Sequence, residues 1–316
     1  MLIELVVTMA AITSVQDQDP TNPPATLEVD SVEVVGSRLE DAAQDFVRTI
    51  NVEPPLGTLP GRWTKPLCIS VANFRAPWGR FMVDGVTKRA TDVGLNVSGP
   101  GCRPNVLIVA TDDGPQTADA IVRLDRRRFR TPVDHSSQDL SDLNHFRRSD
   151  AAVRWWQVTY PRTVESGEVM GGRANGIETW GERGTNQGLI TPKMTVRNPS
   201  LIAPTIRYDI ETVTVVVDLS KTDDVPMSAL ADYIALVTLA QIDPRERFDG
   251  QSTILNMFDE PNRYASMTDW DLDYMHAVYD ADLTRNSVRG HQAEVARALV
   301  ARRQARFVSQ PEKTSE

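Results

Sequence analysis

Apolar residues recur along the chain at two spacings, which together predict an α/β (α+β) fold. Three segments carry apolar residues three and four positions apart, the spacing of one helix face, over residues 41–50, 79–94 and 228–243. Three others are short apolar runs typical of strands buried in a sheet, over residues 67–74, 105–113 and 211–220. Because strands and helices alternate, we expect a single domain in which helices pack on a mixed sheet.

The N-terminal region differs in composition from the rest of the chain. Residues 1–16 hold an apolar stretch too short to cross a bilayer, as in an export signal, although Glu4 interrupts it and no basic residue precedes it. Residues 17–40 are polar and Pro-rich apart from VDSVEVVGSRL, residues 29–39. This alternating run predicts a strand that docks on a sheet edge or remains a tether. We expect a periplasmic or secreted protein, or a cytoplasmic one if residues 1–16 are not a signal.

Two further boundaries follow from composition. The main domain is expected over residues 41–283, with a Gly-rich insertion at about residues 163–192 that has no apolar periodicity. Residues 284–316 form a basic C-terminal helix and tail, with six arginines against the single acid Glu294 between residues 285 and 306. This helix either contacts an acidic partner or a membrane surface, or packs on the domain and exposes its arginines to water.

Charge and cysteine usage narrow the class of protein. The net charge of -9 argues against a nucleic-acid-binding protein, which needs Lys and Arg to neutralise phosphates. No segment after the N-terminus is apolar for long enough to cross a membrane. Cys68 and Cys102 are the only cysteines, and in an exported chain they predict one disulfide. Such a disulfide would contribute about 4 kcal/mol of stability in the chain-entropy model. In a cytoplasmic chain the same residues would be two free thiols.

The C-terminal third contains the most specific pattern. The segment MTDWDLDYMHAVYD, residues 267–280, resembles the closing helix of matrixin-type metzincin zinc peptidases. The residues that match the family pattern are Met267, Thr268, Asp271, Leu272, Met275, Val278 and Tyr279. Thr268 and Asp271 also predict a capping box at the start of this helix. The order of strand, helix, STILNMF turn and capped helix strengthens the resemblance, which implies a metzincin-like domain over about residues 41–283.

A second resemblance covers the whole chain. The segments RYDIETVTVVVDLSK, LADYIALVTLAQID and CRPNVLIVATDDG together resemble an uncharacterised family of exported proteins of Gram-negative bacteria. This resemblance implies a fold and a location but no activity.

The metzincin resemblance also implies where a zinc site would lie. In that family the first helix carries H-E-x-x-H-x-x-G-x-x-H, which supplies three ligands and a general base. On the helix 228–243 the motif places Asp232, Leu236 and Ile242 at the ligand positions, Tyr233 at the base and Leu239 at the glycine. Two aliphatic side chains cannot bind zinc. The resemblance therefore implies a vestigial site in a degenerate, metzincin-like pseudo-peptidase without a cofactor.

We expect a non-catalytic binding or scaffold protein of the cell envelope, whose partner is a peptide or an envelope protein. A peptide could add to an exposed sheet edge, which the run at residues 29–39 could also occupy. An active zinc peptidase with a non-standard site is an alternative, although the four histidines are scattered along the chain.

A divalent-metal-dependent hydrolase is a further alternative. Asp112 and Asp113 follow the apolar run NVLIVAT, and Asp218 ends the run VTVVVD. Carboxylates at the carboxyl ends of buried strands lie where open α/β sheets bind ligands and magnesium. The sequence TDDG is also typical of an ordinary turn after a strand.

Overall fold

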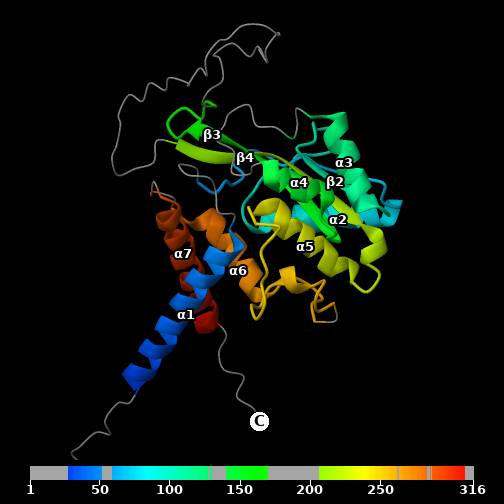
Figure 1. The fold of residues 1–316 in the computed structure, drawn as a ribbon. Helices are drawn as coiled ribbons and strands as arrows, with labels where there is room; N and C mark the ends of the chain where they lie inside the picture. Colours follow the sequence, from blue (N-terminus) through cyan, green and yellow to red (C-terminus); the bar gives the residue numbers. More distant parts are fainter. Residues whose placement is uncertain are drawn as a thin grey trace, which may run out of the picture. The chain divides into compact units, whose positions relative to one another are not determined.

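A four-stranded sheet organises Leu39–Glu316, the larger of the two units into which the chain divides (Figure 1). The structure, a computed structural model, describes residues 28–51, 59–126, 129, 140–169, 206–261, 263–282, 285 and 287–309. The segment 1–16, expected to be an export signal, lies outside the described residues. The predicted Gly-rich insertion lies outside them from residue 170 onward.

The sheet is mixed, with the strand order β1-β2-β4-β3. The parallel strands are β1 (Ile69–Ala72), β2 (Val106–Thr111) and β4 (Ile206–Asp218), and β3 (Val153–Thr163) lies antiparallel to β4 at one edge. The prediction of an α/β fold with a mixed sheet is therefore confirmed. The predicted strands did not include β3, because Arg154 and Gln157 interrupt its apolar run, yet both side chains are buried.

Helices cover both faces of the sheet. On one face lie α2 (Ala76–Asp92) and α5 (Met227–Leu239), and on the other lie α3 (Gly114–Leu124) and α4 (Leu140–Arg148). Successive residues of a strand point to opposite faces, so Val215 and Trp155 join the first core while Val216 and Trp156 join the second. Burial on both faces explains why the second half of β4 is a continuous run of β-branched residues.

The segment 29–39 is helical, so the strand predicted there is wrong. It belongs to α1 (Glu28–Ile50). Apolar residues at positions 32, 35 and 39 continue the spacing of the buried residues Ala43, Phe46 and Ile50. Extending an existing helix adds one hydrogen bond per residue fixed, whereas an isolated strand has no partner. As a helix, the segment does not add a strand to the sheet.

Two C-terminal helices pack against each other, α6 (Asp269–Asp280) and α7 (Val288–Ser309). Val295 and Leu299 of α7 are buried in the first core. Asp273 of α6, also buried, pairs with Arg303 at 3.1 Å and with Arg306 at 2.6 Å. The inward face of this basic helix therefore follows the second of the two alternatives, in which the helix packs on the domain.

Cys68 and Cys102 form a disulfide, with their Cα atoms 6.0 Å apart. The bond joins the residue before β1 to the loop before β2. None of the described helices is both long enough and apolar enough to cross a membrane.

The predicted capping box at the start of α6 is confirmed and extends to a buried network around Asp271. Thr268 Oγ1 accepts from the Asp271 amide at 3.1 Å, and the Thr268 amide donates to Asp271 Oδ2 at 3.0 Å. Oδ2 also accepts from the amide of Ile254, in the short helix η2 (Ile254–Asn256), at 2.8 Å. Thr253 Oγ1 donates to Oδ1 at 2.6 Å. Burial raises the pKa of Asp271 to about 6, although these hydrogen bonds lower it.

We expect the substitution Asp271→Asn to change the pH dependence of stability. A folded pKa of about 6 lies above the unfolded value of about 4. The stability that Asp271 contributes is therefore fully present below pH 4 and is lost as pH rises through 6. The amide retains an acceptor for the two backbone N–H groups but does not titrate. The free energy of unfolding of wild type relative to Asp271→Asn should therefore fall by on the order of 2 kcal/mol between pH 4 and pH 7.

Chemical denaturation of both proteins at each pH measures this difference. The comparison at a common pH removes the opposite contribution of His291, whose pKa is lowered to about 4 by burial and then by Arg62. Parallel pH profiles for the two proteins would contradict the prediction.

Candidate functional site

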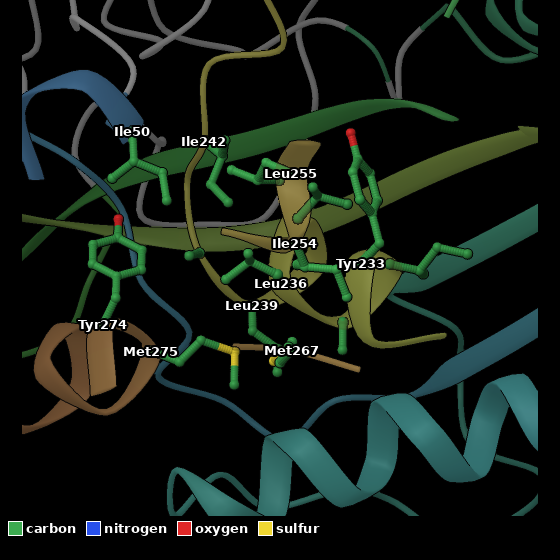
Figure 2. Packing of buried hydrophobic residues seen from close by; sticks show 14 of the residues in the cluster. Ile50, Tyr233, Leu236, Leu239, Ile242, Ile254, Leu255, Met267, Tyr274 and Met275 are labelled. Atoms are coloured by element: carbon green, nitrogen blue, oxygen red, sulfur yellow. The ribbon is translucent and has the colours of Figure 1, made fainter. Parts of the chain in front are cut away.

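Helix α5, on which the metzincin resemblance places the zinc motif, is buried on every side. Eleven of its 13 residues are buried, from Ala229 to Leu239. Figure 2 shows apolar side chains of α1, α6 and η2 packed around it. A helix that is buried all round presents no side chain to solvent, so its chemistry depends on what its few polar residues contact.

Of the four positions at which the resemblance implies a vestigial site, three lie in this core. Leu236 and Ile242 are 0% exposed. The ring of Tyr233 makes edge contacts with Trp155 and Phe258, at centroid distances of 6.2 and 5.2 Å. Burial raises the pKa of Tyr233, so its phenol stays protonated. Hydrocarbon therefore fills the space over the expected ligand positions.

Asp232, the fourth of these positions, is held in an ion pair by two hydrogen bonds. Nε and Nη2 of Arg89 donate to its two carboxylate oxygens, both at 2.7 Å. The amide of Met267 donates to Oδ2 at 2.8 Å. The hydrogen bond to Asp232 raises the pKa of Arg89, so the guanidinium stays charged. Asp232 thus ties α5 to α2 and to the segment before α6.

The C-terminal end of α5 is closed by side chains from other segments. The last four carbonyls of a helix have no partner within it. Here Trp63 Nε1 donates to Thr238 at 2.9 Å, Gln157 Nε2 to Val237 at 2.8 Å and Ala240 at 2.9 Å, and the Tyr279 hydroxyl to Leu239. These donors allow the helix to end inside the core at Leu239, the position to which the metzincin resemblance assigns a glycine.

At the carboxyl ends of β2 and β4, the fold itself uses two of the three candidate metal-binding carboxylates. Asp113 caps α3, accepting from the Gln116 amide at 3.0 Å. Asp218 accepts from the Gly114 amide at 3.0 Å and from Ser220 Oγ at 2.6 Å. Burial raises the pKa of Asp218, but these hydrogen bonds outweigh it and hold the pKa below its ordinary value. Asp112 is exposed. Within the described ranges, no three His, Cys, Asp or Glu residues are grouped to hold a metal ion.

Arg154 occupies the space at the first turn of α3. Its side chain is 1% exposed, and Nη2 donates to the Ala151 carbonyl at 2.8 Å. Burial lowers the pKa of Arg154, and the charge of Asp218 partly offsets this. A Cβ atom on Gly114 would lie 2.7 Å from Arg154 Cζ, a distance that real Cβ atoms do not adopt. The guanidinium therefore lies where an anion would have to approach the N-terminus of this helix.

The sequence did not predict a charged hollow of about 190 Å³ beside the first half of β4. Its lining comes from three segments and consists of Thr64, Lys65, Arg162, Gly167, Arg207, Asp209 and Glu211. Asp209 is 2% exposed and accepts from Thr64 Oγ1 at 2.7 Å. It also pairs with Arg207 at 3.0 Å and with Arg162 at 3.3 Å.

One signal in the sequence could have located this hollow. Arg207, Asp209 and Glu211 alternate with Tyr208 and Ile210, so three charged residues share one face of a strand. That alternation differs from the apolar run in the second half of β4. The contributions of residues 64–65 and 162–167 depend on tertiary structure and leave no local signal.

For the Asp232 ion pair, we expect Asp232→Ala to lower the free energy of unfolding by about 3–5 kcal/mol, because it leaves Arg89 without its buried carboxylate. The double variant Arg89→Met/Asp232→Leu should regain much of this loss, since apolar side chains can replace a buried pair. Urea denaturation of the two variants measures these effects. Lys88→Ala serves as the control, because it breaks an exposed ion pair on α2, the helix that carries Arg89. Equal losses in Asp232→Ala and Lys88→Ala would contradict the structural role of Asp232.

For the first turn of α3, we expect Gly114→Ala to cost about 1–3 kcal/mol of stability, because the added methyl group overlaps Arg154. In an Arg154→Ala background the same substitution should cost little. A double-mutant cycle in urea measures the coupling. Additive effects would show that the guanidinium does not fill this space.

Comparison with protein-family models, with curated proteins and with solved structures gives no match to this chain. Its function must therefore be inferred from the filled core around α5, the ion pair of Asp232 and the open, charged hollow beside β4.

Proposed function

We propose that this chain is a non-catalytic binding or scaffold protein of the cell envelope, with a degenerate metzincin-like architecture. The observation that carries the proposal is the apolar core at Leu236 and Ile242, where the resemblance would require zinc ligands. A catalytic zinc site needs three protein ligands and an open position for water. Asp232 is the only member of the set that could bind a metal, and Arg89 and Met267 already occupy its oxygens.

The order of elements supports the proposed architecture. Strand β4 is followed by α5, by the turn at η2 and by the capped helix α6. This is the order on which the resemblance depends, and Thr268 and Asp271 form the expected cap. A buried helix in place of a zinc helix keeps these elements together without the metal.

The disulfide supports the proposed location. Disulfides persist in the periplasm and outside the cell, whereas thiols remain reduced in the cytoplasm. In that setting the partner would be a peptide or another envelope protein. We do not propose the alternative of a metal-dependent hydrolase, because Asp113 and Asp218 already cap and anchor α3.

Metal analysis tests the proposal. We expect purified protein to contain far less than one zinc per chain, because no ligand set lies on α5. We also expect its unfolding temperature to be unchanged by zinc or by a chelator, since only a ligand that binds the folded state stabilises it. Elemental analysis and thermal unfolding measure the two quantities.

Two controls separate the alternatives. One zinc per chain, together with a chelator-sensitive cleavage of a peptide library, would overturn the proposal and favour an active peptidase. Stabilisation by magnesium that is lost in Asp112→Asn would instead favour the carboxylates at the ends of β2 and β4.

A further inference from the structure

The hollow beside β4 is the strongest candidate for a ligand site. Its volume of about 190 Å³ exceeds that of several water molecules, so it has room for a ligand group. Three cations line it, Lys65, Arg162 and Arg207, against two carboxylates, Asp209 and Glu211. One positive charge is therefore left over at neutral pH, so the hollow favours a ligand with a single negative charge.

The buried carboxylate fixes the orientation of Arg207. Nε of Arg207 donates to Asp209 Oδ1 at 3.0 Å and Nη2 to Oδ2 at 3.4 Å, so one edge of the guanidinium is held. Asp209 is held in turn by Thr64 Oγ1 at 2.7 Å. An arginine fixed along one edge loses little entropy when its other edge binds a ligand.

Donors remain after the internal pairs are formed. Among the described residues, Nη1 of Arg207 has no acceptor, and together with Nη2 it forms the second edge of the fork. Lys65 Nζ carries three N–H groups and pairs with Glu211, so N–H groups remain. By contrast, Nη1 of Arg162 donates to the Gly167 carbonyl at 2.9 Å and Nη2 donates to Glu211 at 3.1 Å. Its Nε pairs with Asp209. The free donors thus belong to Arg207 and Lys65.

These donors match a carboxylate. The planar edge of a guanidinium forms two parallel hydrogen bonds to a carboxylate, and an ammonium adds a third donor. A phosphate dianion would exceed the single excess charge and would face Asp209 and Glu211 at close range. The match in charge therefore favours a monoanion over a dianion.

We propose that the hollow binds a carboxylate group of a ligand through the outer edge of Arg207 and the ammonium of Lys65. Asp209 is a positioning residue that presents Arg207. The inference rests on the proposed binding function and adds the chemistry of the partner, a carboxylate from either a peptide C-terminus or an acidic side chain.

Three capped peptides test the proposal on the full chain. Acetyl-Gly-Gly as the free acid carries a C-terminal carboxylate, its C-terminal amide carries none, and acetyl-Gly-Asp-Gly-amide carries a side-chain carboxylate. We expect saturable shifts of the Thr64 and Gly167 amide signals in NMR titrations with one or both acids and none with the neutral amide. The acid that binds identifies the source of the carboxylate.

Two arginine variants supply the matched comparison. Arg207→Gln should weaken binding about tenfold or more, since a charge-assisted hydrogen bond is lost. Arg247→Gln removes the same charge from another arginine that pairs with an aspartate two residues on, Asp249 at 3.2 Å, and should leave binding unchanged. Lys65→Gln tests the second donor and serves in place of Arg207→Gln if that variant unfolds.

Three outcomes would overturn the carboxylate site: no saturable shifts with either acid, equal shifts with the neutral amide, or equal binding by Arg207→Gln and Arg247→Gln. Cleavage of a peptide or retention of zinc would instead contradict the proposed non-catalytic function and leave the carboxylate site intact. The two failures are therefore distinguishable.

Discussion

The complete burial of α5 is the constraint on which the rest of the structure depends. A helix enclosed by protein must find partners for its terminal carbonyls within the protein. Trp63, Gln157 and Tyr279 supply them, each from a different part of the chain. A satisfied hydrogen bond contributes about 1 kcal/mol net, whereas an orphaned buried group costs about 1–3 kcal/mol. The cost of leaving these carbonyls unpaired therefore fixes the sheet, the segment before β1 that carries Trp63, and α6 relative to α5.

The same burial conflicts with metal chemistry on this helix. A zinc site requires polar ligands and access for water, while an enclosed helix requires apolar side chains of matching volume. Leu236 and Ile242 satisfy the second requirement and exclude the first. The carboxylate of Asp232 pairs in this setting with the guanidinium of Arg89. The position at which the resemblance implies a first ligand therefore carries an ion pair between α5 and α2.

Local patterns predicted the elements whose surroundings are simple. The β-branched run of β4 and the Thr268–Asp271 cap of α6 both follow from neighbours in sequence. The strand expected at residues 29–39 was wrong because alternating apolar residues also fit a helix, and the following buried helix decides between them. Strand β3 was missed because buried Arg154 and Gln157 make it look polar, and the carbonyls that Gln157 binds, those of Val237 and Ala240, are remote in sequence. The hollow was missed for the same reason.

Two polar regions of this sheet differ in how many of their hydrogen-bonding groups the fold itself uses. At the carboxyl ends of β2 and β4, Asp113 and Asp218 accept hydrogen bonds from amides in the first turn of α3. Arg154 fills the space beside that turn and donates to the Ala151 carbonyl. The hollow beside the first half of β4 is lined by three cations and only two carboxylates. A polar region whose groups are all paired within the fold can stabilise the fold, whereas binding a partner requires a region with donors left over. Ligand binding is therefore expected at Arg207 and Lys65, although α/β sheets usually bind ligands at the carboxyl ends of their strands.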